Sequence, residues 1–341
     1  PAVYGTGSPK GNNAEMKTDG WELSLSWRDS FKLGGKPFDY SIKAMVWDSK
    51  SVITKYVNDT GSLGTVKGFI ENGGSPSSYY VGMTVGEIWG YTVAGLFRDQ
   101  ADIDSSAIHD FVQASDKVTR PGQVKIADLD GNGFIDPGNF AVDDHGDLRI
   151  IGNQSPRYRY GVNLSARWNG IGLSVFLQGV GARDWYPGSD AGMFWGKYGR
   201  PFFALIPSIH NYTDDMYSAE RNNWDTAYWP RMTTYQSNGT KNWTRLLEIP
   251  NTRYIQSAAY LRVKNIQLDY SFPKHICSAI RLQGLKIYVN AENLFTFTPL
   301  HKYAPNFDPE GLSYDSDFAS AADGYTYPIL KSVTVGVNIT F

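Results

Sequence analysis

A run of acidic and amide side chains within nine residues offers the most specific chemistry in this sequence. The run Asp128-Leu129-Asp130-Gly131-Asn132-Gly133-Phe134-Ile135-Asp136 places oxygen-bearing side chains at loop positions 1, 3, 5 and 9, with a glycine at position 6. Loops that wrap Ca²⁺ use this spacing, together with the backbone carbonyl at position 7. Hard oxygen ligands in a tight loop favour Ca²⁺ over softer metals. We therefore predict a structural calcium site that pins a long loop, with ligands from Asp128, Asp130, Asn132, the Phe134 carbonyl and Asp136.

The twelfth loop position lacks the usual ligand. Calcium loops of this kind carry a bidentate glutamate there, and this sequence has Asn139 instead. Asp143, Asp144 or Asp147 could supply the missing carboxylate, and we include Asp147 in the predicted ligand set. The alternative is an Asp- and Asn-rich turn in water that binds no metal.

A second candidate site is the long polar and aromatic stretch over residues 181–253. Connections of this length are uncommon in compact domains and are usually functional. Its indole rings could stack on sugar rings or grip peptides, and we take Trp185, Trp195 and Trp229 as candidate substrate-binding residues. The alternative is that these rings pack loop against loop, or against a partner protein.

Enzyme and nucleic-acid signals are weak. The five histidines show no metal-ligand spacing, and neither a Gly-x-Ser-x-Gly elbow nor a phosphate loop occurs. The acid pairs Asp214-Asp215 and Asp308 with Glu310 could mimic glycosidase carboxylates, but in loops we expect them to be solvated charges. The net charge is −2 with scattered Lys and Arg, which does not fit a nucleic-acid partner. We predict that the chain is not an enzyme and does not bind nucleic acid.

The elements that must carry these groups are strands, because apolar and polar residues alternate with period two along much of the chain. We predict about eight or nine strands of roughly 9–11 residues, the length that crosses a bilayer when tilted. No run of 18 apolar residues occurs, so a transmembrane helix is not expected. Several stripes begin or end in Trp, Tyr or Phe, as aromatic girdles at lipid interfaces do. The apolar stripes lie at Trp21–Trp27, Phe38–Val46, Trp89–Phe97, Tyr158–Trp168, Ile171–Leu177, Ile266–Phe272, Leu285–Ala291 and Val333–Phe341.

The connections between these stripes are unequal. Asn169-Gly170 is a tight hairpin turn, whereas residues 98–156, with the calcium-type motif, and residues 181–253 form long loops. Short turns on one side and long extracellular loops on the other are typical of an outer-membrane barrel. We therefore predict an all-β fold, an antiparallel segment of a transmembrane β-barrel.

Several ordered motifs resemble the carboxy-terminal half of TonB-dependent outer-membrane transporters of the SusC/RagA type. The resemblance covers nearly the whole chain from about Trp21. It is carried by Gly90-Tyr91 through Gly95-Leu96-Phe97, Pro121–Lys125, the Asp-x-Asp-Gly-Asn-Gly loop, Asp147–Asn153, Pro156–Gly161, Phe176–Gly179, Trp229-Pro230-Arg231, Tyr260–Ile266, Glu292–Thr296, Asp308-Pro309-Glu310 and Tyr327-Pro328.

This resemblance implies a 22-stranded barrel with an amino-terminal plug in the outer membrane. It also implies import of oligosaccharides or peptides, energy supplied through TonB, and a SusD-like surface lipoprotein as a lid. The plug, the TonB-contacting segment and the earlier strands are absent from residues 1–341, which open at Pro1 rather than at a methionine. We therefore interpret the chain as the carboxy-terminal part of such a barrel.

The final strand adds a separate signal. Thr334, Gly336, Ile339 and Phe341 have the spacing of the signal by which outer-membrane barrels are recognised for insertion. A terminal strand with alternating residues must pair where the barrel closes, and its last aromatic residue belongs at an interface. The alternative is an ordinary last strand.

Two further interpretations of the whole chain stay open from the sequence. One is a secreted, calcium-stabilised, carbohydrate-binding β-sandwich, in which the apolar stripes lie hidden between two sheets. The other is a glycoside hydrolase. A barrel would instead present its apolar stripes to outer-membrane lipid.

Overall fold

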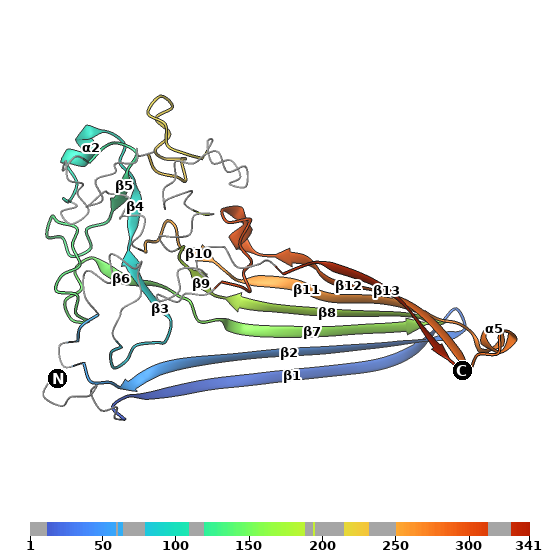
Figure 1. Cartoon of the computed structure of the whole chain (residues 1–341). Coiled ribbons are helices and arrows are strands. Elements are labelled where there is room, and N and C mark those ends of the chain that lie inside the picture. Colours follow the sequence, from blue (N-terminus) through green and yellow to red (C-terminus); the bar gives the residue numbers. More distant parts are fainter. Residues whose placement is uncertain are drawn as a thin grey trace, which may run out of the picture. The chain divides into compact units, whose positions relative to one another are not determined.

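The computed structural model describes residues 12–58, 61–63, 79–108, 119–187, 194, 215–231, 250–312 and 329–341. Within these residues, seven long strands form one sheet whose neighbours follow the chain order (Figure 1). The strands are β1 (Glu15–Leu33), β2 (Lys36–Lys55), β7 (Arg157–Trp168), β8 (Ile171–Ala182), β11 (Tyr260–Ser271), β12 (Gly284–Phe297) and β13 (Ser332–Thr340). The registered pairs from β2 to β13 are all antiparallel. The predicted all-β antiparallel architecture is confirmed.

The remaining described elements are short. Three two-stranded sheets pair β3 (Glu87–Tyr91) with β6 (Leu148–Asn153), β4 (Val93–Leu96) with β5 (Val124–Ile126), and β9 (Asp184–Trp185) with β10 (Gln256–Ser257). The helical turns are α2 (Gln100–Asp104), α5 (Lys274–Ala279) and the 3-10 helix η2 (Pro299–Lys302). In the described part of the chain, every helix is too short and too polar to cross a membrane.

The seven-stranded sheet has one apolar and one polar face, because side chains alternate along each strand. The strand registers align whole rows across six strands. One row is apolar and consists of Tyr40, Ala166, Leu173, Leu268, Val289 and Val335. The next row, on the opposite face, consists of the uncharged polar residues Ser41, Ser165, Ser174, Gln267, Asn290 and Thr334.

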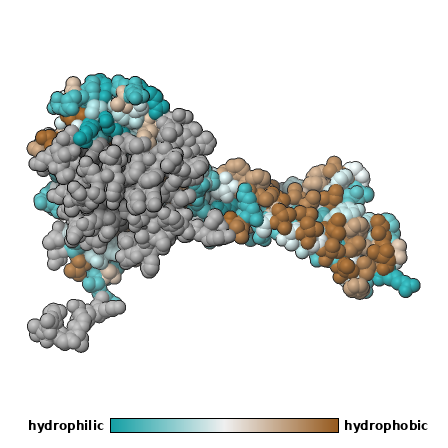
Figure 2. All heavy atoms as spheres, turned by 45° about the horizontal axis from the view of Figure 1, so that its top comes forward, coloured by the Kyte–Doolittle hydropathy of each residue, from teal (hydrophilic) through white to brown (hydrophobic). Residues whose placement is uncertain are grey.

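The apolar face is exposed rather than covered by a second layer. Leu268 is 52% exposed and Val335 is 72% exposed. Figure 2 shows hydrophobic residues gathered along the surface of the strands. Soluble proteins rarely leave so large an apolar surface uncovered, and a sandwich would bury it between two sheets. The arrangement therefore fits a face that contacts hydrocarbon.

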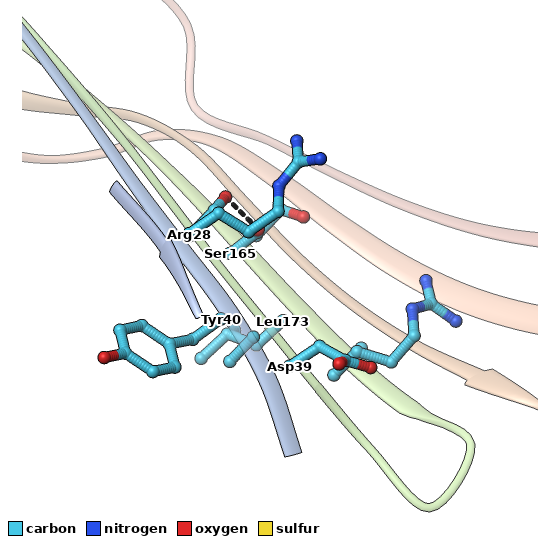
Figure 3. Close-up of a pocket in the computed structure, with 10 residues that line it drawn as sticks. Arg28, Asp39, Tyr40, Ser165 and Leu173 are labelled. Atoms are coloured by element: carbon cyan, nitrogen blue, oxygen red, sulfur yellow. Dashed lines mark hydrogen bonds between the residues drawn. The ribbon is translucent and has the colours of Figure 1, made fainter. Parts of the chain in front are cut away.

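The polar face holds a shallow cavity of about 230 Å³ lined in part by Arg28, Asp39, Ser165 and Arg167. In Figure 3, the ring of Tyr40 projects away from Arg28 and Ser165. The side chain of Tyr40 in β2 thus lies on the opposite face from those of Arg28 in β1 and Ser165 in β7, as the period-two pattern predicts.

Tight turns join the long strands at one end. Asn169 and Gly170 between β7 and β8 both have positive φ angles, 49° and 85°, as the favoured two-residue hairpin turn requires. A Cβ atom at Gly170 would lie 2.7 Å from the Ser271 carbonyl oxygen. Glycine is therefore required at this turn for two reasons, the positive φ angle and the close approach of the Ser271 carbonyl.

One predicted barrel strand is wrong. The alternating stretch Trp89–Phe97 does not join the seven-stranded sheet, since its residues form β3 and β4 in two small sheets. All five residues of β3 are buried. Alternation alone cannot distinguish a membrane strand from a short strand buried on both faces.

The chain divides into two compact units, each built from separated segments. The first unit includes residues 50–153 and 215–254. Within it, the Tyr91 amide donates to the Pro250 carbonyl at 2.9 Å and the Arg231 amide donates to the Gly122 carbonyl at 2.6 Å. The ring of Tyr217 lies so close to Gly122 that no Cβ fits there. Loops from different hairpins therefore fold as one body.

The second unit contains most of the sheet, and an ion pair joins β2 to β7 within it. The carboxylate of Asp48, which is 6% exposed, accepts hydrogen bonds from Arg157 Nε at 2.6 Å and from the Tyr158 amide at 3.1 Å. The Arg157 Nη2 atom contacts the second carboxylate oxygen, which completes a bidentate pair. Arg157 belongs to the Pro156–Gly161 motif, so this motif has a structural role.

We expect Leu268→Arg to destabilise the folded receptor by up to about 2–4 kcal/mol, because a charge on the lipid face costs that much at the bilayer midplane and less toward the interfaces. The matched control is Gln267→Arg, the adjacent residue on the polar face, which should change stability little. Denaturant unfolding of the full-length receptor in lipid bilayers measures both. Equal losses for the two variants would contradict the assignment of the faces.

Candidate functional site

The predicted calcium loop follows β5 and folds back on itself through its own side chains. The Asp128 carboxylate accepts hydrogen bonds from the Gly131 amide at 2.6 Å and from the Gly133 amide at 2.9 Å. Both glycines have positive φ angles, 76° and 85°, which glycine adopts without steric cost. The hydrogen bond from Gly133 is the main reason that the pKa of Asp128 lies below its usual value. The loop therefore keeps Asp128 ionised.

Asp147 joins this loop from the residue just before β6. The carboxylates of Asp128, Asp130 and Asp147 offer oxygen atoms that lie within 4.8 Å of one another. Asp147 is fully buried, and it accepts hydrogen bonds from the Leu129 amide at 2.6 Å and from the Asp136 amide at 3.0 Å. Burial is the main cause that raises its pKa, and the charges of Asp130 and Asp128 raise it further.

The structure brings some of the predicted calcium ligands together and engages others in hydrogen bonds within the turn. It brings Asp128, Asp130 and Asp147 together, and it selects Asp147 among the three candidates for the missing carboxylate. The Asn132 side-chain nitrogen donates to Asp130 at 3.1 Å and to Asp136 at 3.2 Å. Asp136 also accepts from the Gly138 amide at 2.7 Å. Asp136 and Asn132 thus serve the turn, and the Phe134 carbonyl remains a predicted ligand.

In the part of the chain that the structure describes, no Lys or Arg pairs with the three carboxylates. Among the described residues, Lys and Arg form their ion pairs elsewhere. Three negative groups this close repel one another unless a proton or a cation lies between them. The donor set is oxygen only, as Ca²⁺ prefers.

Two of the three aromatic candidates, Trp185 and Trp229, are buried. Trp185, in β9, is 1% exposed and packs against Phe307 with ring centroids 4.9 Å apart. Trp229 is also 1% exposed and stacks on Tyr254 at 5.7 Å. Trp195 lies outside the described residues. Burial favours the packing interpretation for Trp185 and Trp229, and their contact with a ligand stays a prediction.

A buried ionic cluster on the polar face of β11 was not expected from the sequence. Arg262 is 3% exposed; it contacts Asp308 at 2.6 Å and also pairs with Glu310. Lys264 contacts Glu310 at 2.8 Å. The expectation that Asp308 and Glu310 are solvated charges is wrong, because these two arginine and lysine side chains bind them. A sequence signal for this cluster existed in two of the ordered motifs. Tyr260–Ile266 contains basic residues, and Asp308–Glu310 contains acidic residues.

The same cluster holds the segment Pro299–Leu312 against the sheet. Arg183 reinforces it, with its guanidinium donating to the Pro309 carbonyl at 3.3 Å and to the Leu312 carbonyl. Within this segment, the Thr298 hydroxyl caps η2 by accepting from the Leu300 amide at 3.2 Å. The segment is thus fixed along the polar face.

Comparisons with known proteins support this fold. No model of a known protein family matches the chain. TonB-dependent receptor P3 from Formosa agariphila is 24% identical over 349 residues, covering 100% of this chain and 30% of the receptor. TonB-dependent receptor P26 from the same organism is 22% identical over 347 residues, covering 100% of this chain and 31% of the receptor. The chain therefore spans about a third of the length of the curated relatives that it matches.

Solved structures show the same fold. The structure of the RagAB peptide transporter matches with a TM-score of 0.62 and 16% identity, over 100% of this chain and 31% of that chain. The RagAB peptide importer in its open-open state matches with a TM-score of 0.62 and 17% identity, over 100% of this chain and 30% of that chain.

These matches and the two-faced sheet make the chain similar to one class of proteins, the TonB-dependent outer-membrane receptors. The predicted resemblance to the carboxy-terminal barrel portion of SusC/RagA-type receptors is thereby confirmed. The relatives are receptors and transporters, which confirms the prediction that the chain is not an enzyme. The sandwich alternative is wrong, because the matched fold is a barrel and the described long strands form a single sheet.

We expect Arg262→Ala to release the segment Pro299–Leu312, because Asp308 and Glu310 would lose their main cationic partner. Breaking a buried ion pair costs about 3–5 kcal/mol. Hydrogen exchange of peptides from residues 299–312 in the full-length receptor measures the loss. Arg167→Ala is the control, since Asp269 keeps Lys286 at 3.2 Å; faster exchange in both variants alike would contradict the role of the cluster.

Proposed function

We propose that the receptor to which this chain corresponds imports oligosaccharides or peptides across the outer membrane. The observation that carries the proposal is the match of the whole chain to about a third of the length of TonB-dependent receptors. The sheet with one apolar and one polar face supports it. A polar inner wall suits the passage of a hydrophilic solute. The RagAB structures are those of a peptide transporter, which supports peptides as one of the two cargo classes.

The proposal includes two protein partners. A SusD-like surface lipoprotein would cover the extracellular side, and TonB would supply energy through a region that this chain does not contain. The resemblance to the SusC/RagA type supports both partners. Outer-membrane lipid is the third, since it would contact the apolar face.

Deleting the receptor gene should abolish uptake of one cargo class and leave the other class unchanged. Cells would be given labelled neutral oligosaccharides and labelled peptides in parallel, and uptake of each would be measured. Wild-type receptor should restore uptake, whereas a receptor that lacks its TonB-contacting segment should restore surface binding alone. Unchanged uptake of both cargo classes in the deletion strain would contradict the proposal.

We also propose that the loop over residues 128–147 binds a structural Ca²⁺ ion. The clustering of three carboxylates supports this role, because a divalent cation offsets their mutual repulsion. Asp128, Asp130 and Asp147 would hold the ion, and the Phe134 carbonyl would add to its oxygen shell. The ion would then stiffen the connection between β5 and β6.

We expect Asp128→Ala to weaken Ca²⁺ binding by at least about tenfold, because even residues that only support metal ligands cost 10–100-fold in affinity. Calorimetric titration of the intact, metal-free receptor measures binding. Asp143→Ala is the matched control, since Asp143 is an exposed acid outside the three-carboxylate cluster. Absence of Ca²⁺ uptake by the wild-type receptor would exclude the site.

A further inference from the structure

The ring of Tyr288 in β12 lies across the backbone of the last strand. Tyr288 and Gly336 are opposite each other in the register of β12 and β13. A Cβ atom at Gly336 would collide with the ring and the hydroxyl of Tyr288. Any other residue at this position would therefore displace the ring. Gly336 is part of the predicted terminal signal. The position of the Tyr288 ring gives a second, structural reason for a glycine there.

The same arrangement occurs a second time inside the sheet. Tyr160 in β7 is opposite Gly179 in β8, and a Cβ atom at Gly179 would collide with the Tyr160 ring and hydroxyl. Past the glycine, the Tyr160 hydroxyl donates a hydrogen bond of 3.0 Å to the Tyr260 carbonyl in β11. A tyrosine that crosses a glycine therefore joins three consecutive strands.

Tyr288 has the first two parts of this arrangement and lacks the third. Among the described strands, β13 is the last in the sheet, so one of its edges has no neighbour there. In that same part of the chain, the Tyr288 hydroxyl makes no hydrogen bond. Unpaired strand edges do not occur in contact with hydrocarbon, because their amide and carbonyl groups would lose water without gaining partners.

We propose that Tyr288 stabilises the closure of the barrel, where β13 pairs with a strand outside this chain. Its ring lies across Gly336, and its hydroxyl donates to a main-chain carbonyl of the strand that pairs with the free edge of β13. That strand would be antiparallel and would come from the part of the same receptor that this chain does not span. The proposal rests on the barrel fold and not on the identity of the cargo.

The test is Tyr288→Phe in the full-length receptor, which removes the hydroxyl and keeps the ring. Backbone hydrogen exchange over residues 332–340 should become about three- to tenfold faster, the factor that corresponds to one net hydrogen bond. Tyr160→Phe is the matched control: it should speed exchange in β8 and β11 and leave β13 unchanged. Unchanged exchange of β13 in Tyr288→Phe would overturn the proposal.

A pair of variants tests the crossing itself. Gly336→Ala should reduce the fraction of heat-modifiable, folded receptor on gels. Tyr288→Ala combined with Gly336→Ala should recover part of it, because the colliding ring is gone. Equal folding of wild type and Gly336→Ala would overturn the geometry, as would a double variant no better than Gly336→Ala. Protection of β13 that depends on receptor concentration would indicate a second copy as the partner and would also overturn the proposal.

Discussion

A β-strand in hydrocarbon must satisfy its backbone through neighbouring strands, and this constraint determines the rest of the structure. Because hydrogen bonds lie in the plane of the sheet, side chains are free to differ on its two faces. The result is the row from Tyr40 to Val335 on one face and the row from Ser41 to Thr334 on the other. The same pairing fixes the register, since a slip of one residue would turn every apolar side chain to the polar face.

Several of the more buried charged groups in the described part of this sheet lie in ion pairs. Asp48 binds Arg157, Asp269 lies between Arg167 and Lys286, and Arg262 joins two acids. Such pairs contribute little net stability compared with apolar packing, but losing one partner is costly. Their effect here is on position: each joins elements that are distant in the sequence, and the pair at Arg262 directs a loop along the inner wall.

Sequence patterns predicted the long strands well because membrane strands display their alternation over many residues. They failed at Trp89–Phe97, where a short stretch inside a folded loop alternates without facing lipid. The calcium-type loop was predictable from local spacing, but the choice of Asp147 was not, because a contact across many residues selects it. The burial of Trp185 and Trp229 could not be predicted from the sequence either. The residue type is the same whether an aromatic side chain contacts a ligand or packs on another ring.

The shared folding of two loop segments in the first compact unit has a consequence for chimeric receptors. Residues 50–153 and 215–254 share hydrogen bonds at Tyr91 with Pro250 and at Gly122 with Arg231, so neither segment completes its fold without the other. Recombination that swaps a single hairpin between two receptors would separate these halves and leave buried amides and carbonyls without partners. A chimera that exchanges both segments together would keep these hydrogen bonds.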